Sequence, residues 1–335
     1  MIPSFSYLRA RTVDEAVRYL SLDGARAHAG GTDLLGCLRE HIFDVTTVVS
    51  IAGLKELTGI KETPAGGLRI GSLTTIAEVA RNPVIRSKYR ALSMAASEVA
   101  SPQLRNQGTI GGNLCQKPRC WYYRGEFHCL RKGGDQCFAV EGENAYHCIL
   151  GGENCFIVHP SDSAPALVAL QASVTIVGPE GRRTVPVENF HMPPSEDYMR
   201  ETVLEPAEIV TEIVLPPPAE GLRSSYRKVR ARRTWDFALA GVALATVFSG
   251  DQAADCVRVR AAEWASNTSA SSGSCSARWS VASSIPDFEP QSVRAPQRAG
   301  RDDTRDRHPL GRDRPRHSTR AAAAGCPHGV HLGRD

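Results

Sequence analysis

The sequence has no apolar segment long enough to cross a membrane. Its longest apolar run, residues 237–248, includes Gly241, whereas a membrane-spanning helix needs about 20 apolar residues. No apolar block follows a basic segment at the N-terminus, so the sequence shows no signal peptide. We therefore expect a soluble protein of the cytoplasm with no membrane association, and export together with a signal-bearing partner stays open.

The body of the chain has no excess of either charge. From residue 258 onward there are 13 Arg, no Lys and 8 Asp or Glu, so this tail is basic. The other 257 residues hold 27 Lys or Arg against 28 Asp or Glu. Because the formal net charge of +4 arises in the tail, it does not indicate nucleic acid as a partner of the folded part.

The tail also lacks the residues from which a core is built. Over residues 258–335 only eight are Val, Ile, Leu, Met or Phe, and Tyr is absent. Such a composition cannot bury enough apolar surface to fold, so we expect this region to be disordered. The abrupt change in composition favours a frameshift near codons 255–260 over a genuine disordered tail. Resequencing that returned the same frame, with no frame downstream that restores a folded pattern, would contradict the frameshift.

The ten cysteines lack the spacing of common metal motifs. Six of them lie within residues 115–155, and 8, 7 and 17 residues separate Cys120, Cys129, Cys137 and Cys155. Zinc sites and ferredoxins usually pair thiols a few residues apart. Without a secretion signal, a cluster of this kind favours metal over disulfides. The spacing leaves an iron–sulfur cluster, zinc and buried free thiols open.

The N-terminal region predicts an α/β unit. Thr12 and Glu15 have the spacing of a capping box before a helix. Residues 25–29 predict a strand, and Thr32 and Asp33 can cap a following helix. The Gly-Gly pair between them permits close backbone approach to a ligand, and free N–H groups there attract phosphate. An ordinary strand-to-helix turn is the alternative.

A second α/β region follows. Thr74 or Thr75 can cap a helix over 76–80, which Asn82-Pro83 ends, and residues 89–100 predict another helix. Residues 106–113 predict a glycine-rich loop suited to an oxygen-rich ligand. Further elements are predicted by apolar patterning. They are strands at 155–158, 172–177, 208–215, 225–230 and 237–248, and a helix at 164–170.

Three motifs in this order resemble one protein family. Ala-Gly-Gly-Thr-Asp-Leu at 29–34, Arg-Asn-Gln-Gly-Thr-Ile-Gly-Gly-Asn at 105–113 and Pro-Ser-Asp at 160–162 are similar to motifs of the FAD-binding medium subunit of molybdenum hydroxylases. This is the xanthine dehydrogenase and CO dehydrogenase family. Tyr-Arg-Lys-Val-Arg at 226–230 matches its later lysine-bearing strand. The resemblance covers about residues 1–255.

The resemblance implies a set of cofactor-binding residues and no catalytic residue. The first loop would hold the FAD pyrophosphate through backbone N–H groups, and the second would line the flavin and its phosphates. Asp162 would bind ribityl or ribose hydroxyls, and Lys228 would lie near the flavin ring or its phosphate. The implied FAD residues are Ala29, Gly30, Gly31, Thr32, Asp33, Leu34, Asn106, Thr109, Gly111, Gly112, Asn113, Asp162 and Lys228.

The cysteine-rich insert resembles a subtype of that family. About fifty residues separate the second and third motifs, where most members have some twenty. Such inserts are similar to those of 4-hydroxybenzoyl-CoA reductase and the periplasmic type of bacterial aldehyde oxidoreductase, which carry a 4Fe-4S cluster. The match implies Cys120, Cys129, Cys137 and Cys155 as ligands and leaves Cys115 and Cys148 outside the set.

We therefore expect an α+β protein built from two FAD-binding subdomains. They would span 1–56 and 57–216, with the insert at about 115–156, followed at 217–257 by the start of a third domain. The resemblance implies an electron-transfer flavoprotein whose partners are a molybdenum-cofactor large subunit, a 2Fe-2S small subunit and an external electron acceptor. A stand-alone FAD oxidoreductase and a non-catalytic zinc-binding scaffold are the alternatives.

Overall fold

The computed structural model describes residues 2–148, 152–233, 235–249 and 252–263, with only the backbone described for the last range. The chain divides into two units, Met1–Cys275 and Ser276–Asp335, and all described residues belong to the first. Residues 258–335 are predicted to be disordered, but residues 258–263 belong to a described strand, and residues 264–335 lie outside the described residues. Among the described helices, none combines the length and apolar character needed to cross a membrane.

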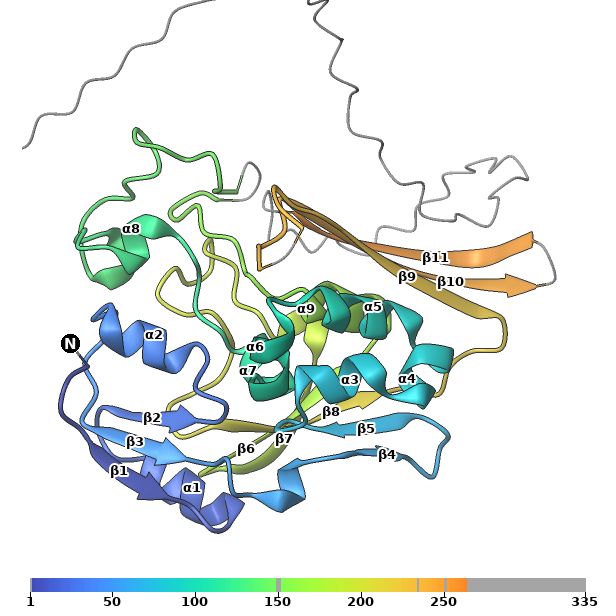
Figure 1. The fold of residues 1–335 in the computed structure, drawn as a ribbon, viewed down its shortest axis with the longest axis horizontal. Coiled ribbons are helices and arrows are strands. Elements are labelled where there is room, and N and C mark those ends of the chain that lie inside the picture. The colour runs from blue at the N-terminus through green and yellow to red at the C-terminus, as the bar shows by residue number, and fades with distance from the viewer. Residues whose placement is uncertain (1, 149–151, 234, 250–251, 264–335) are drawn as a thin grey trace, which may run out of the picture. The chain divides into compact units, whose positions relative to one another are not determined.

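The N-terminal sheet consists of three parallel strands in the order β1-β3-β2 (Figure 1). These are β1 (Ser6–Arg9), β2 (Ala25–His28) and β3 (Thr47–Ser50). Helix α1 (Val13–Leu20) connects β1 to β2, and α2 (Leu34–Arg39) follows β2. The predicted strand, turn and helix around Gly30-Gly31 are therefore present, with the turn at the carboxyl end of β2.

Helix α1 begins much as its sequence predicts. The Thr12 hydroxyl accepts a hydrogen bond from the Glu15 N–H at 3.1 Å. The Glu15 carboxylate accepts from the Arg11 N–H at 2.7 Å and from the Tyr19 hydroxyl at 2.6 Å. Glu15 thus caps the residue before Thr12, because Tyr19 and Arg11 hold its carboxylate in that direction. The predicted capping box is only half formed.

The central sheet has five antiparallel strands in the order β4-β5-β8-β6-β7. Its middle strand β8 is buried at six of its seven positions, as expected for a strand covered on both faces. A tight turn through residues 178–181 joins β6 to β7. The five strands are β4 (Ile60–Glu62), β5 (Leu68–Gly71), β6 (Ser173–Gly178), β7 (Gly181–Pro186) and β8 (Ile209–Leu215).

A group of short helices lies on one side of this sheet (Figure 1). Thr75 caps the start of α3, as predicted, and Glu78 completes a capping box with it. Asn82 ends α3 and also starts α4, since its side chain accepts from the N–H groups of Val84 and Ile85. The helices are α3 (Ile76–Arg81), α4 (Pro83–Lys88), α5 (Arg90–Glu98), α6 (Pro102–Gln107), α7 (Ile110–Leu114) and α9 (Ser163–Ala169).

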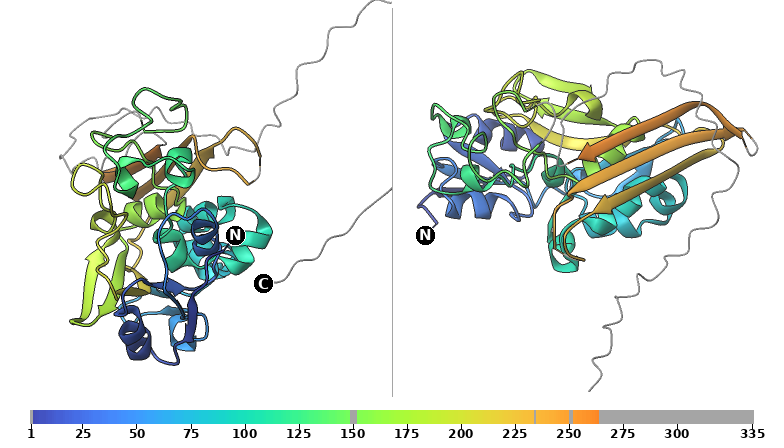
Figure 2. Two further views of the ribbon diagram at one scale, coloured as in Figure 1. Left: turned by 90° about the vertical axis from the view of Figure 1, so that its left-hand side faces the viewer. Right: turned by 90° about the horizontal axis from the view of Figure 1, so that it is seen from above.

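The third sheet is antiparallel, with the order β11-β10-β9 (Figure 2). It comprises β9 (Leu222–Val229), β10 (Ala240–Ser249) and β11 (Gln252–Glu263). Strand β9 packs on α5, and β10 and β11 pack on α9. The domain boundary predicted at residue 257 falls inside β11, where Val257 pairs with Thr246 of β10 and the pairing continues to Glu263. Residues 258–263 are a strand because β10 supplies backbone partners for them.

Two sequence-based predictions of local structure are wrong. Residues 106–113 are largely helical rather than a loop, since α6 ends at Gln107 and α7 starts at Ile110. Residues 155–158 form no strand and are held by turns, such as the Cys155 N–H bond to the Gly152 carbonyl at 2.8 Å. Within the insert, the described regular elements are α8 (Trp121–Arg124) and a 3₁₀ turn at Leu130–Lys132.

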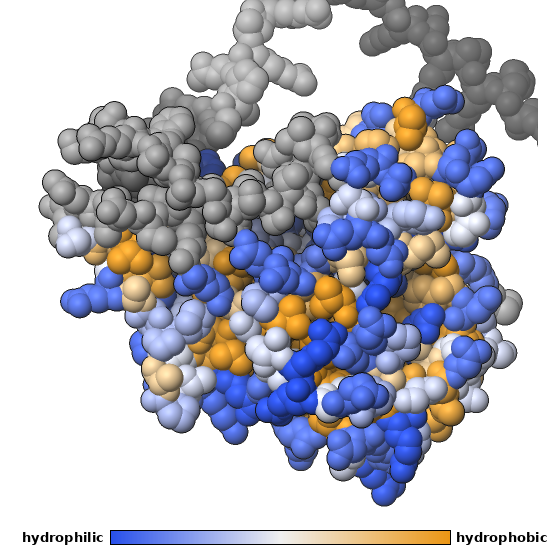
Figure 3. All heavy atoms as spheres, turned by 180° about the vertical axis from the view of Figure 1, so that it is seen from behind, coloured by the Kyte–Doolittle hydropathy of each residue, from blue (hydrophilic) through white to orange (hydrophobic). Residues whose placement is uncertain are grey.

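The presence of both sheets and helices confirms the predicted α+β class. The largest core cluster lies between the central sheet and its helices and includes Ile70, Leu92 and Phe190, all fully buried. A second cluster lies between α1 and the N-terminal sheet. From behind, the described surface is mostly hydrophilic with smaller hydrophobic groups between (Figure 3), as is usual for a folded protein in water.

Candidate cofactor site

The turn between β2 and α2 presents a row of unpaired backbone donors. The N–H groups from Gly30 through Leu34 donate to no protein acceptor among the described residues. Gly31 has a φ of +72°, a conformation that glycine adopts without strain. Consecutive amides in such a turn form a concave site for anionic oxygens.

The two glycine-rich motifs contact each other directly. A side chain at Gly30 would collide with the backbone carbonyl oxygen of Gln107. The Gln107 side chain also donates to the Gly30 carbonyl at 3.2 Å. Only glycine permits this approach, so the first motif is pressed against the end of α6, 77 residues further along the chain.

The backbone N–H groups of Gly111 and Gly112 in the second motif already donate to protein acceptors. The Gly111 N–H bonds to the Ser72 carbonyl at 2.9 Å, and the Thr109 hydroxyl accepts from Gly112 N–H at 3.2 Å. A Cβ at Gly111 would lie 2.8 Å from that of Ser72. These glycines therefore let α7 pack closely on the end of β5. They form a wall of the site rather than a set of free amides.

Both motifs line one cavity. It holds about 1010 Å³ of empty space, part of it open to solvent. Nine of the thirteen residues implied for FAD line it, namely Ala29, Gly30, Gly31, Thr32, Asp33, Leu34, Thr109, Gly111 and Gly112. The other residues that line the cavity are not predicted from the sequence. They include Arg26, Cys37, Phe43, Ile51, Ser72, Leu73, Cys115, Gln116, Lys117, Leu204, Ile209 and Val210.

Most of these missed residues carry no local signal, because they come from separate elements. Ser72 is the exception, since it directly follows β5, and residues just after a strand often bind ligands. Lys117 and Arg26 place positive charge at the same cavity. Apolar residues such as Phe43, Ile51 and Leu73 supply a wall suited to an aromatic ring.

Asp33 does not cap α2 with its side chain. Its carboxylate accepts from the Lys117 N–H at 2.8 Å and pairs with Arg119 at 2.7 Å and Arg124 at 2.9 Å. Burial opposes ionisation, but the two guanidinium groups outweigh it, so the pKa of Asp33 lies below its usual value. Arg124 also pairs with Glu40 at 2.9 Å. Asp33 thus ties the amide-bearing turn to the start of the insert.

The two implied asparagines lie outside the cavity lining. Asn113 accepts a hydrogen bond from the Ser161 hydroxyl at 2.6 Å, which links the second motif to the third. Asn106 is exposed and lines a separate hollow beside Thr75 and Glu78. The structure therefore does not bring Asn106 together with the first motif.

Asp162 and Lys228 form a buried ion pair. Their side chains are 6% and 1% exposed, and Lys228 Nζ lies 2.8 Å from the Asp162 carboxylate. The Tyr226 hydroxyl donates to the other carboxylate oxygen at 2.8 Å, and Lys228 also donates to the Glu98 carbonyl at 3.3 Å. Burial raises the pKa of Asp162 despite these partners. Both residues implied for FAD therefore have protein partners that join β9 to α9 and α5.

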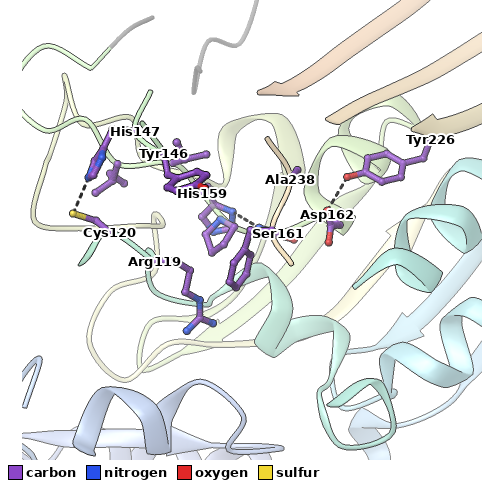
Figure 4. Close-up of a pocket in the computed structure, with 13 residues that line it drawn as sticks. Arg119, Cys120, Tyr146, His147, His159, Ser161, Asp162, Tyr226 and Ala238 are labelled. Carbon is purple, nitrogen blue, oxygen red and sulfur yellow. Dashed lines mark hydrogen bonds between the residues drawn. The ribbon is translucent and has the colours of Figure 1, made fainter. Parts of the chain in front are cut away.

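A second cavity, of about 470 Å³, runs from Cys120 to Asp162 (Figure 4). At one end the His147 ring contacts the Cys120 sulfur, with Nε2 and Sγ 3.1 Å apart. At the other end Tyr226 points toward Asp162. The third motif lies along this cavity, so it separates the insert from the ion pair.

Two histidine rings contact each other beside the third motif, with their planes tilted by 53°. The rings of His159 and His191 are 4.1 Å apart, and His191 Nε2 lies 3.1 Å from the Leu114 carbonyl. Burial lowers the pKa of His191 to about 4 and, together with the neighbouring His191, holds the pKa of His159 well below its usual value. Both rings are therefore neutral near pH 7.

The implied cluster ligands are close enough to affect one another. The interaction between the thiols of Cys137 and Cys155 lowers the pKa of Cys137 to about 5 and raises that of Cys155. Burial, and then the charges of Cys129 and Cys137, raise the pKa of Cys120. None of the described cysteines is in a disulfide. Among the described residues, no three His, Cys, Asp or Glu side chains are arranged to hold a metal ion.

A buried cation lies beside these thiols. Arg131, 1% exposed at its side chain, pairs with Glu201 and donates to the Tyr198 carbonyl. Lys117 pairs with the other oxygen of Glu201. Arg131 also acts on Cys155, where its charge favours the thiolate. Two cations therefore share one buried carboxylate between the larger cavity and the cysteines.

Comparison with known proteins shows the family. Residues 3–218 match the family model described as FAD binding domain in molybdopterin dehydrogenase. The chain is 40% identical over 245 residues to the aldehyde oxidoreductase FAD-binding subunit PaoB of Escherichia coli strain K12, covering 72% of this chain and 76% of that protein. It is 30% identical over 252 residues to the carbon monoxide dehydrogenase medium chain of Hydrogenophaga pseudoflava, covering 74% of this chain and 71% of that protein.

Solved structures agree with the sequence relatives. The chain matches carbon monoxide dehydrogenase from Hydrogenophaga pseudoflava with a TM-score of 0.60 at 27% identity, over 78% of this chain and 75% of that one. Quinoline 2-oxidoreductase from Pseudomonas putida 86 has the same fold, with a TM-score of 0.58 at 23% identity, over 78% of this chain and 77% of that one. The chain therefore belongs to the FAD-binding, or medium, subunits of the molybdenum hydroxylase and xanthine dehydrogenase family of oxidoreductases.

Proposed function

We propose that this chain is the FAD-containing electron-transfer subunit of a molybdenum hydroxylase complex that oxidises an aldehyde or an aromatic substrate. The observation that carries the proposal is the cavity shared by the two glycine-rich motifs, with five unpaired amides on one wall. The similarity to an aldehyde oxidoreductase subunit supports the substrate class. The partners would be a molybdenum-cofactor large subunit, a 2Fe-2S small subunit and an external electron acceptor.

The cavity residues fit the chemistry of FAD. The amides from Gly30 to Leu34 would hold the pyrophosphate oxygens, and Lys117 and Arg26 would offset their negative charge. The apolar wall around Phe43 would exclude water from the ring. FAD, when bound, supplies the chemistry that takes electrons from one partner and passes them to another. The protein's own contribution is to bind and orient the cofactor.

We extend the proposal to a 4Fe-4S cluster held by Cys120, Cys129, Cys137 and Cys155. Cluster ligands are thiolates, and the low pKa of Cys137 together with the buried Arg131 favours that form. A four-iron cluster holds its sulfurs further apart than a single metal ion does. Thiols that interact without converging on one point are therefore compatible with it.

The test is an anaerobic visible spectrum of the purified full-length chain, with flavin, iron, sulfide and zinc assayed on the same sample. Flavin bands with a broad iron–sulfur shoulder are the expected result. The Cys137→Ser variant should lose iron and sulfide and keep flavin. The Cys148→Ser variant, which removes a cysteine outside the implied set, should keep both.

Other outcomes would contradict parts of the proposal. Zinc with no flavin would indicate a zinc-binding scaffold. Flavin without iron would contradict the proposed 4Fe-4S cluster and leave the proposed FAD site standing. Turnover of substrate by the isolated chain, without partner subunits, would indicate a stand-alone FAD oxidoreductase.

A further inference from the structure

Helices α3 to α6 carry an open groove that is separate from the FAD cavity. It holds about 1680 Å³ of empty space, part of it solvent, and four arginines line it. These are Arg81, Arg86, Arg90 and Arg105. The four helices adjoin one another on one side of the central sheet (Figure 1), so the arginines form one surface although they come from separate elements.

Positive charge is concentrated on this segment. Residues 76–107 hold five Lys or Arg against two Asp or Glu, whereas the rest of the first 257 residues hold 22 against 26. Lys88 is paired with Glu62 at 3.1 Å. Arg81, Arg86 and Arg90 are exposed and have no carboxylate within ion-pair distance among the described residues.

The two acidic residues of the segment are engaged elsewhere. Glu98 pairs with Arg230 at 2.6 Å, outside the groove. Glu78 accepts from the backbone and the hydroxyl of Thr75, both at 2.8 Å. Arg105 donates to the Val99 carbonyl at 2.7 Å, and its pKa is lowered by burial and by nearby Arg81, with Glu98 opposing. Gathering like charges in this way costs stability, so an external anion would relieve it.

The other polar groups of the groove are already used. The hydroxyls of Ser87, Ser93 and Ser97 donate to backbone carbonyls. The N–H groups at the start of α4 are capped by Asn82. The groove therefore offers guanidinium groups beside apolar side chains such as Ala77, Ala80 and Met94. Phosphate sites are commonly built from backbone amides, whereas guanidinium groups alone also match carboxylates.

We propose that this groove is a docking surface for an acidic segment of a partner protein, rich in Asp and Glu. The charge of the groove is complementary to carboxylate side chains, and such complementarity speeds the encounter of proteins and sets their orientation. The surface does not depend on FAD or on an iron–sulfur cluster.

The test measures binding of a fluorescent oligoglutamate peptide to the full-length chain by anisotropy. The unmodified chain should bind it and release it as salt rises from about 20 to about 300 mM, since exposed charges are screened over that range. The Arg81→Gln, Arg86→Gln, Arg90→Gln triple variant should bind at least about tenfold more weakly. The corresponding Arg-to-Lys triple variant, which keeps the charge, should retain most of the affinity.

A matched control carries Arg39→Gln, Lys55→Gln and Lys61→Gln, which removes the same charge from exposed positions outside the groove. It should bind within about twofold of the unmodified chain. Equal losses in both triple variants would overturn the proposal, because binding would follow total charge. Tighter binding of inorganic pyrophosphate than of the peptide, lost in the groove variant, would also overturn it and make the groove a phosphate site.

Discussion

The guanidinium of Arg124 binds the carboxylate of Asp33, with Nη2 and Oδ1 2.9 Å apart, although 91 residues of sequence separate them. Asp33 belongs to the turn with the unpaired amides, and Arg124 belongs to the cysteine-rich insert. Arg119 and the N–H of Lys117 hold the same carboxylate. The insert therefore fixes the conformation of the turn that we propose binds FAD.

Replacing Asp33 with Asn should affect both stability and FAD binding. The variant leaves the largely buried Arg119 without a negative partner and leaves Arg124 with only the half-exposed Glu40. Such a loss costs roughly 2–4 kcal/mol of unfolding free energy, and the freed turn should bind FAD more weakly. Urea unfolding and FAD titration measure the two effects.

The Glu40→Gln variant is the matched control for Asp33→Asn. It removes the other carboxylate that Arg124 contacts, but Glu40 is 39% exposed. Exposed pairs contribute about 0–1 kcal/mol, so stability and FAD affinity should stay close to those of the unmodified chain. Equal effects in the two variants would argue against a special role for the pair of Asp33 and Arg124.

The contact between Gly30 and Gln107 predicts a different response at two glycines. Gly30→Ala places a methyl group against a backbone carbonyl that cannot move without shifting α6. We expect a loss of roughly 1–3 kcal/mol, as for other overpacked sites, and at least tenfold weaker FAD binding. Gly53→Ala should be neutral in both measurements, because nothing lies within 4 Å of the added carbon.

The sequence predicts local elements of this fold better than it predicts long-range contacts. The turn at Gly30 and the helix cap at Thr75 depend on neighbouring residues, and both are present. Residues 106–113 were predicted as a loop because glycine disfavours helix. In the structure, the carbonyls of Ser72 and Thr74 accept from Gly111 and Ile110 and hold the first turn of α7 in place.

In the candidate site, too, local motifs are predictable from the sequence and long-range contacts are not. The ordered motifs were sufficient to identify nine residues that line one cavity. The partners of Asp162 could not be inferred, since Tyr226 and Lys228 lie 64 and 66 residues away. Nor does spacing indicate that Asp33 faces the insert, because only packing determines which direction its side chain takes.

The ion pair of Asp162 and Lys228 predicts strong coupling in a double-mutant cycle. Asp162→Asn leaves a buried ammonium group without its counter-ion, and Lys228→Met leaves a buried carboxylate. Each change should cost about 3–5 kcal/mol of unfolding free energy. The double variant removes both charges, so it should be more stable than the sum of the single losses predicts, by about 1–3 kcal/mol. Urea unfolding of the four proteins gives the coupling energy.

FAD titration of the same four proteins separates a structural role from a cofactor-binding one. If the pair acts by joining β9 to α9, the double variant should recover FAD affinity together with stability. If Asp162 and Lys228 contact FAD, affinity should stay low in the double variant even where stability returns. Additive stability losses would contradict the coupling in either case.

The pKa of His191 predicts that stability falls in mild acid. The folded chain keeps this ring neutral down to about pH 4, whereas the unfolded chain protonates it near pH 6.5. Between these values the unfolded state binds more protons, so stability decreases as pH falls. The unmodified chain should lose unfolding free energy between pH 7 and pH 5, and His191→Gln should reduce that loss by about 2 kcal/mol. Urea unfolding at both pH values measures it, and an unchanged loss in the His191→Gln variant would contradict the prediction.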